Sequence, residues 1–166
     1  TVHPLQAFGF AFTDMVDLIA GYSGSVKATL EEKMAAAKGI PLADVRLDAP
    51  IPHPRHDIIC VGQNYLEHAL ESARYKGVEY KKPAHPVYFS KRVDRAVAPE
   101  GVIKSHSDIT AKLDYEAELA IIIGATCDHA KPEDVFKYIF GYTVINDVSA
   151  RDLQMGHVQY SFGKGL

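Results

Sequence analysis

The 166-residue chain contains no tryptophan and only two cysteines, Cys60 and Cys127. These cysteines lack the CxxC spacing of zinc sites and redox motifs, so we interpret them as free thiols in a reducing cytoplasm. No apolar run approaches the roughly 20 residues of a membrane-spanning helix. The first residues also lack the charged-then-apolar pattern of a signal peptide. The sequence therefore predicts a cytoplasmic protein that does not contact a membrane.

Positive charge is also scarce. Lysine and arginine together number 18 against 21 acidic residues, which gives a formal net charge of −3, and the longest basic cluster is Lys81-Lys82. A nucleic-acid surface needs basic residues gathered on one face, so we exclude nucleic acid as a partner. Low-complexity segments and internal repeats are absent. The hydrophobic share of 47% is that of an ordinary globular protein.

The first part of the chain is predicted to be helical. Thr13 and Asp14 can cap a short helix that ends at Gly21, because a side-chain oxygen before a helix satisfies one of its free N–H groups. Ser25 can cap a second helix over residues 26–38 in the same way. We therefore expect a small helical region before the main body of the protein.

Three prolines, Pro50, Pro52 and Pro54, follow this region and predict an extended connector. Proline lacks a backbone N–H and cannot continue a helix or a central strand. We therefore place a boundary here, with a small N-terminal region over residues 1–50 and a second domain over residues 51–166.

Beyond the connector, strand-like segments outnumber helical ones. The predicted strands cover residues 58–61, 87–89, 102–103, 116–123 and 142–147, and the predicted helices cover residues 67–75 and 131–140. Strands that do not alternate regularly with helices indicate an α+β, β-rich fold rather than a doubly wound sheet. The strand-rich part is too short to close a sheet, and its glycine-rich end at Leu166 has no terminating pattern. We expect a fragment of a longer protein.

Two glutamates, Glu116 and Glu118, begin the apolar run that continues to Gly124. Side chains alternate faces along a strand, so these two should point the same way at the start of a buried strand. Like charges on one face repel each other and resist burial. Something cationic should hold them, and oxygen-only ligands favour a hard divalent ion such as Mg²⁺ or Mn²⁺.

Asp147 ends a second apolar segment and could complete a three-carboxylate site with this pair. A simpler interpretation makes Asp147 a helix cap or a turn residue, and the two glutamates part of an exposed strand face. The combination of all three acids favours the metal site over either simpler interpretation.

His68 and Glu71 are three residues apart on a predicted helix and should share one of its faces. A carboxylate beside an imidazole fixes its tautomer and raises its basicity, which suits a general base that activates water. The alternative is a solvated pair without a catalytic role.

Lys164 lies between two glycines, which let backbone approach a ligand closely while the ammonium offsets negative charge. The GxxxxGK pattern of a phosphate loop is absent, and an exposed loop lysine is the simpler interpretation. Arg151 and Asp152 are interpreted as a local ion pair. Gln154 is close enough in sequence to reach the same pocket.

Four segments together resemble the fumarylacetoacetate hydrolase family. They are VGQNYLEHALES, KLDYEAELAIIIG, GYTVINDVSARDLQ and the terminal SFGKG. Their order and spacing match the family as well as their residues, over roughly residues 57–166. The resemblance implies a mixed β-sandwich-like roll with short helices, preceded by a variable N-terminal extension. Family members continue past the GK motif, so it also implies that this chain holds an incomplete catalytic domain.

The resemblance implies a role for each matching residue. These are the metal-binding acids Glu116, Glu118 and Asp147, the active-site lysine Lys164, the lid dyad His68 and Glu71, and the pocket-facing Gln154. Gln63 departs from the pattern, because many relatives have Arg or Leu at that position. Because of this departure, the resemblance does not determine how the lid contacts the substrate, and therefore it does not identify the substrate.

By the same resemblance we expect a Mg²⁺-dependent hydrolase, with Mn²⁺ as a substitute and Ca²⁺ as an alternative in a crystal. Its substrate would be a 2-oxo acid of the acylpyruvate or fumarylacetoacetate type, cleaved at a C–C bond through an enolate by water that His68 activates. The same enolate chemistry suits an oxaloacetate-type decarboxylase, or a 2-hydroxyhepta-2,4-diene-1,7-dioate-type isomerase of aromatic catabolism. A catalytically silent metal-binding homologue is a further alternative. The resemblance also implies a homodimer.

Overall fold

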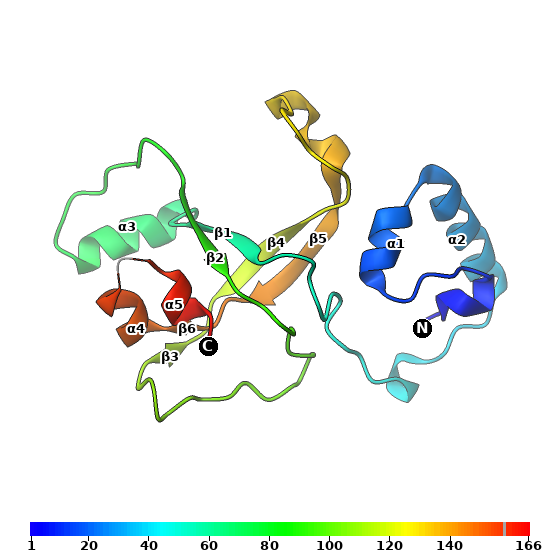
Figure 1. The fold of residues 1–166 in the computed structure, drawn as a ribbon, viewed down its shortest axis with the longest axis horizontal. Coiled ribbons are helices and arrows are strands. Elements are labelled where there is room, and N and C mark those ends of the chain that lie inside the picture. Colours follow the sequence, from blue (N-terminus) through cyan, green and yellow to red (C-terminus); the bar gives the residue numbers. More distant parts are fainter. Residues whose placement is uncertain (158) are drawn as a thin grey trace. The chain divides into compact units, whose positions relative to one another are not determined.

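The computed structural model describes residues 1–157 and 159–166, and Figure 1 shows the course of the chain. The chain divides into two compact units, each assembled from separate stretches of sequence. Unit 1 contains residues 1–55, 95–103 and 117–146, and unit 2 contains residues 56–94, 104–116 and 147–166. Both units draw on sequence after residue 50, so the domain boundary near that residue stays a prediction.

The start of unit 1 is helical, as predicted. Its elements are the 3₁₀ helices η1 (Leu5–Phe8) and η2 (Leu42–Asp44) and the α-helices α1 (Met15–Gly21) and α2 (Gly24–Ala36). Asp14 caps α1 by accepting a hydrogen bond from the backbone N–H of Asp17 at 2.8 Å. The predicted cap at Ser25 is wrong, because the Ser23 side chain accepts from the Val26 N–H and α2 begins two residues earlier.

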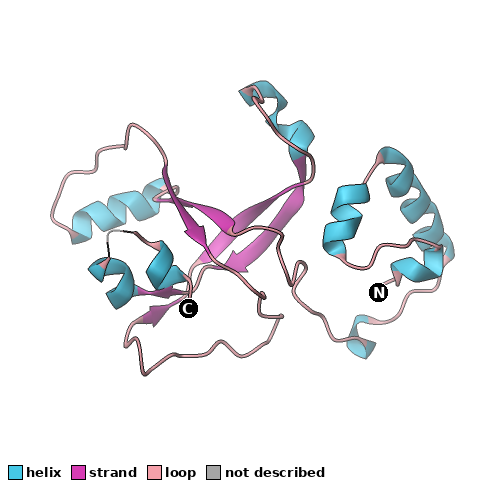
Figure 2. Ribbon diagram, in the orientation of Figure 1, coloured by secondary structure: helices cyan, strands magenta, loops and turns pink. Residues whose placement is uncertain are grey.

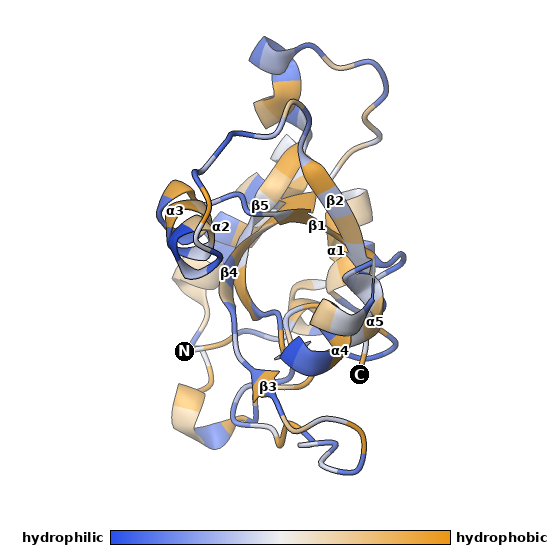
Figure 3. Ribbon diagram, turned by 90° about the vertical axis from the view of Figure 1, so that its left-hand side faces the viewer, coloured by the Kyte–Doolittle hydropathy of each residue, from blue (hydrophilic) through white to orange (hydrophobic). Residues whose placement is uncertain are grey.

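The rest of unit 1 contains an antiparallel pair of strands, β4 (Ala117–Ile123) and β5 (Ile139–Asn146). The 3₁₀ helix η3 (Pro132–Tyr138) lies between them, where the sequence predicted a longer helix. Both strands are rich in hydrophobic residues (Figure 3). Nevertheless, Leu119 on β4 is 60% exposed and Val144 on β5 is 74% exposed. The expectation of a buried strand is therefore wrong for this face of the hairpin.

Within its described residues, unit 2 holds two short antiparallel pairs of strands and three helices; Figure 2 colours strands and helices differently. Strand β1 (Ile58–Gly62) pairs with β2 (Val87–Lys91), and β3 (Leu113–Asp114) pairs with β6 (Ser149–Ala150). The helices are α3 (Leu66–Tyr75), α4 (Arg151–Gly156) and α5 (Ser161–Lys164).

The short β3–β6 pair contains the most deeply buried of the described residues in unit 2. Ser149 and Ala150 are completely buried, and α5 packs against α4, β2 and β6. Gly163 permits this packing, because an added Cβ would lie 2.6 Å from the backbone nitrogen of Gln154. The predicted strand at residues 102–103 is wrong, because neither residue is in a strand and Val102 is 87% exposed.

Candidate active site

Lys164 lies at the centre of a buried charged cluster in unit 2. Its ammonium donates hydrogen bonds to Glu116 Oε2 at 2.6 Å, Asp147 Oδ2 at 2.8 Å and Ser149 Oγ at 2.8 Å. The Lys164 side chain is only 3% exposed, and its nitrogen lies 5.1 Å from the centre of the Phe89 ring. A lysine ammonium has three donors, so all three are in use. The interpretation of Lys164 as an exposed loop lysine is therefore wrong.

Local backbone contacts bring the two acids of this cluster together. Glu116 lies between β3 and β4, and Asp147 lies between β5 and β6. The Asp147 N–H donates to the Glu116 carbonyl at 2.8 Å, which holds the two residues side by side. Ser149 Oγ in turn donates to the Asp147 carbonyl at 3.0 Å. The bond between Asp147 and Glu116 joins residues 31 apart in sequence, which the pairing of β3 with β6 brings together.

Arg151 holds the outer side of the same cluster. Its guanidinium donates to Asp114 Oδ2 at 2.9 Å, to Glu116 Oε1 at 2.6 Å and to Gln154 Oε1 at 3.0 Å. Glu116 thus has a cationic partner on each carboxylate oxygen. Gln154, which the sequence placed near the pocket, touches this arginine.

The predicted ion pair between Arg151 and Asp152 is wrong. Asp152 instead accepts hydrogen bonds from Thr110 Oγ1 at 2.5 Å and from the Ala111 N–H at 3.0 Å. These bonds tie the start of α4 to the loop before β3 and leave the arginine free to reach Asp114 and Glu116. They also lower the pKa of Asp152, chiefly through the Thr110 hydroxyl.

The charges in this cluster favour the ionised state of Glu116. Burial alone would raise the pKa of Glu116, but hydrogen bonds from Lys164 and Arg151 outweigh burial and hold the pKa below its ordinary value. For Arg151, burial alone would lower the pKa of the guanidinium. The hydrogen bonds to Asp114 and Glu116 outweigh burial and raise that pKa above its ordinary value.

A second lysine in this cluster, Lys91, was missed by the sequence analysis. Its ammonium lies 3.1 Å from Asp147 Oδ1 and donates to the carbonyl oxygens of Val148, at 2.9 Å, and of Lys164. The only signal in the sequence is a lysine at the end of an apolar strand, which is common on protein surfaces. Three carboxylates thus meet three cationic groups: Asp114, Glu116 and Asp147 with Lys91, Arg151 and Lys164.

The predicted metal ligands are only partly brought together. Glu116 and Asp147 share Lys164, whereas Glu118, on β4, belongs to unit 1. Among residues 1–157 and 159–166, no three His, Cys, Asp or Glu side chains form a group that could hold a metal ion. The donor chemistry of Glu116 and Asp147 still suits a hard cation, because both offer carboxylate oxygens. Among the described residues the buried Asp147 Oδ1 accepts no hydrogen bond and forms only its ion pair with Lys91.

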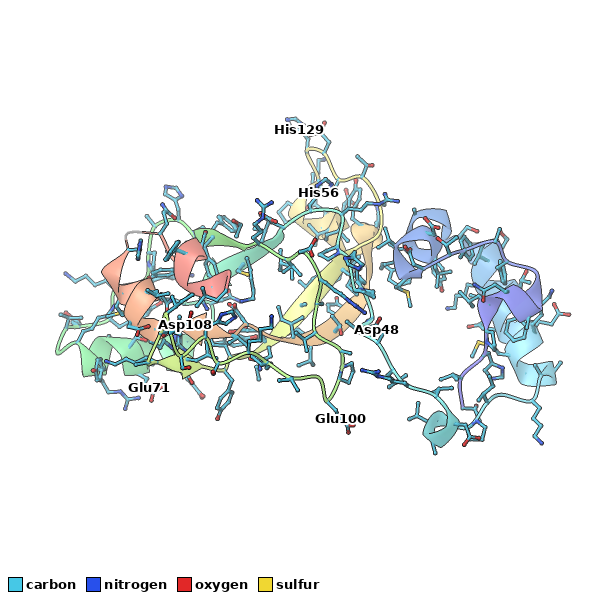
Figure 4. All side chains as sticks on the ribbon, turned by 60° about the horizontal axis from the view of Figure 1, so that its bottom comes forward. Asp48, His56, Glu71, Glu100, Asp108 and His129 are labelled. Carbon is cyan, nitrogen blue, oxygen red and sulfur yellow. The ribbon has the colours of Figure 1, made fainter. Side chains whose placement is uncertain are left out.

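The predicted catalytic dyad lies on α3. His68 and Glu71 are exposed, and within the part of the chain that the structure describes no hydrogen bond or ion pair joins them (Figure 4 labels Glu71). Gln63 lies in the turn before α3 with a left-handed φ of 53°. An open cavity of about 690 Å³ is lined by Tyr65, Glu67, His68, Leu70, Glu71 and Arg74. The pairing of His68 with Glu71 stays a prediction.

Comparisons with known proteins match this part of the chain. A family model described as fumarylacetoacetate (FAA) hydrolase C-terminal matches residues 57–166. The oxaloacetate tautomerase YisK of Bacillus subtilis is 44% identical over 125 residues, which make up 75% of this chain and 40% of that protein.

Solved structures show the same relationship. A fumarylacetoacetate hydrolase from Exiguobacterium antarcticum matches with a TM-score of 0.57 and 34% identity, over 92% of this chain and 50% of that one. A 2-hydroxyhepta-2,4-diene-1,7-dioate isomerase from Mycobacterium marinum matches with a TM-score of 0.54 and 32% identity, over 78% of this chain and 44% of that one. The chain thus spans half or less of the length of these relatives.

Among the described residues, no helix is both long and apolar enough to cross a membrane.

Proposed function

The chain belongs to the fumarylacetoacetate hydrolase family, and we propose that it forms part of an enzyme that interconverts the keto and enol forms of a small 2-oxo acid. The predicted family and the α+β, β-rich fold class are confirmed. The observation that carries the proposal is the buried ammonium of Lys164, held between the carboxylates of Glu116 and Asp147. Similarity to an oxaloacetate tautomerase supports a 2-oxo diacid such as oxaloacetate as the substrate.

The cluster suits enolate chemistry because it places fixed positive charge in a buried environment. When a base takes a proton from the carbon next to the keto group of a 2-oxo acid, negative charge develops on the keto oxygen. Protonation of that oxygen gives the enol, and protonation of the carbon restores the keto form. A preorganised cation stabilises such charge more strongly away from water than in it. Lys164 is the buried cation best suited to this role, since it is covered by Phe89, Ser149 and the two acids.

Lys164 must exchange one of its acceptors before it can donate to a substrate oxygen, because all three donors are in use. Glu116 is the acceptor that loses least from this exchange, since its other oxygen keeps the 2.6 Å bond from Arg151. Asp147 likewise keeps Lys91 at 3.1 Å. The outer cations thus hold the carboxylates ionised and in place while the central ammonium changes partner.

We propose Mg²⁺, or Mn²⁺, as the cofactor, with Glu116 and Asp147 of unit 2 as ligands. The assignment of Glu118 as a third ligand stays a prediction. The oxygen donors of these carboxylates, which are the ligands that a hard divalent ion prefers, support this choice. When bound, such an ion would act as an electrophile for the 2-oxo acid. The lysine and arginine contacts described above orient the acids for that role.

A hydrolase that breaks a C–C bond is the second candidate. It is favoured by the placement of His68 and Glu71 beside an open cavity on α3 and by the similarity to a fumarylacetoacetate hydrolase. Hydrolysis needs an activated water molecule, whereas tautomerisation does not. Similarity to an oxaloacetate tautomerase, at 44% identity, supports tautomerisation as the first candidate. The catalytic pairing of His68 with Glu71, both exposed here, stays a prediction.

A comparison of substrates would test the proposal. The purified protein with Mg²⁺ would be offered enol oxaloacetate, an acylpyruvate and 2-hydroxyhepta-2,4-diene-1,7-dioate, with enol loss followed by ultraviolet absorbance and pyruvate and CO₂ measured separately. We expect faster enol–keto conversion of oxaloacetate than Mg²⁺ alone gives, without pyruvate release. Pyruvate and CO₂ from oxaloacetate would instead indicate a decarboxylase, and hydrolysis of the acylpyruvate alone would indicate the second candidate. Mg²⁺ binding without any turnover would identify a silent homologue.

A further inference from the structure

Lys91 joins three separate segments of unit 2 at one point. It is the last residue of β2, and its ammonium reaches the Asp147 carboxylate and the carbonyls of Val148 and Lys164. These partners are 56 to 73 residues further along the chain. The Lys91 side chain is only 14% exposed, so water competes little for these contacts.

The contacts of Lys91 and Lys164 complement each other. Lys164 donates a hydrogen bond to Asp147 Oδ2, and Lys91 forms an ion pair with the buried Asp147 Oδ1. Among the described residues, Oδ1 accepts no hydrogen bond, so Lys91 is its ion-pair partner. Lys91 also binds the backbone of Lys164 itself. Loss of Lys91 would therefore leave one buried carboxylate oxygen without a cation and release the backbone from which the Lys164 side chain extends.

We propose that Lys91 is a positioning residue for the proposed active site, fixing both the Asp147 carboxylate and the backbone of Lys164. Lys91 acts through these two residues and not on the substrate. Its effect on turnover rests on the proposed function, but its effect on the position of Lys164 does not. The experiment below measures the two effects separately.

Accessibility of the Lys164 amine is the measurement that does not depend on turnover. Reductive methylation of lysines, followed by peptide mass spectrometry, reports how often each amine is free and exposed. In the unaltered protein we expect Lys164 to react far more slowly than the exposed Lys82. In Lys91→Met the modification of Lys164 should become at least tenfold faster. Lys91→Arg keeps the charge and several donors and should restore most of the protection.

Mg²⁺ affinity, measured by isothermal titration calorimetry, separates positioning from simple charge neutralisation. Removing a nearby positive charge should by itself tighten Mg²⁺ binding to Asp147. A misplaced Asp147 carboxylate should instead weaken binding in Lys91→Met by roughly 10- to 100-fold, as the loss of residues that orient metal ligands does. The turnover number should fall by a similar factor while KM stays close to that of the unaltered protein, and Lys91→Arg should recover much of both.

Lys82→Met serves as the control, because Lys82 is exposed and in the same unit. It should leave all three measurements unchanged. The proposal is overturned if Lys164 stays protected in a folded Lys91→Met protein, or if that variant binds Mg²⁺ more tightly. If Lys91→Met does not fold, failure of a folded Lys91→Arg to protect Lys164 overturns it. If the unaltered protein neither binds Mg²⁺ nor turns over any 2-oxo acid, the proposed function fails, and the methylation result still decides the position of Lys164.

Discussion

Replacing Lys164 with methionine removes the ammonium that Glu116 and Asp147 share. Methionine keeps much of the length and apolar character of the side chain, so the change chiefly removes the charge and its three hydrogen bonds. The buried carboxylate of Asp147 and the half-buried carboxylate of Glu116 then face each other across the vacated position. We expect Lys164→Met to lower the free energy of unfolding substantially.

The size of the effect follows from burial. Lys164 and Asp147 side chains are each 3% exposed and Glu116 is 20% exposed, so solvent screens their interaction weakly. Removing one partner of a buried ion pair typically costs about 3–5 kcal/mol. Arg151 and Lys91 still neutralise part of the remaining charge, so the expected loss lies near the lower end, about 3 kcal/mol.

Urea denaturation at neutral pH, followed by circular dichroism, measures this loss. Lys137→Met is the matched control: its ion pair with Asp134 is exposed, and such pairs contribute about 0–1 kcal/mol. The double variant Lys164→Met/Asp147→Asn should be more stable than Lys164→Met alone, because the uncompensated charge is reduced. A loss in Lys164→Met no larger than that in the control would refute the account of a buried, stabilising cluster.

Four further outcomes are expected. Glu116→Gln should abolish Mg²⁺ binding and turnover together, as measured by calorimetry and by the oxaloacetate assay; full Mg²⁺-dependent turnover would contradict the proposed ligand set. His68→Ala should leave oxaloacetate tautomerisation intact, whereas loss of turnover with retained Mg²⁺ binding would favour the hydrolase. Because the pKa of Glu116 is lowered from 4.5, the stability from its ion pairs should be complete above that pH and decline below it. Denaturation at several pH values should show a shallower decline in Glu116→Gln. Light scattering should give the mass of a dimer, and a monomer mass at micromolar concentration would reject the predicted homodimer.

Local sequence patterns predicted those elements that local interactions determine. The cap at Asp14 and helix α3 depend on residues within a turn or two of each other, so the sequence contains their signals. The predicted strand at residues 116–123 differs from β4 by one residue. That residue, Glu116, is nevertheless important, because its position just outside the strand lets its backbone pair with Asp147.

The partners within the charged cluster could not be predicted, because they are distant in sequence. Glu116 and Lys164 are 48 residues apart, and Lys91 binds a carbonyl 73 residues away. Proximity in sequence was misleading for Arg151, because it binds Asp114 and Glu116 and not its neighbour Asp152. The family resemblance identified Lys164 and the acids, but it contained no information on which of them an ammonium would bind.

A buried cluster of charges is an inefficient way to stabilise a fold. The low gain in stability suggests that this cluster has a role other than stabilisation. Desolvating two ions costs several kcal/mol each, and well-packed apolar residues of similar volume are often equally or more stabilising. Unit 2 nevertheless buries Lys164 against two carboxylates, and those carboxylates keep second cationic partners in Arg151 and Lys91. Because each carboxylate has a second cationic partner, the Lys164 ammonium can move away from one of them without leaving that carboxylate unpaired. That property adds little to stability, but it would serve the proposed reaction, in which the ammonium turns toward a developing enolate.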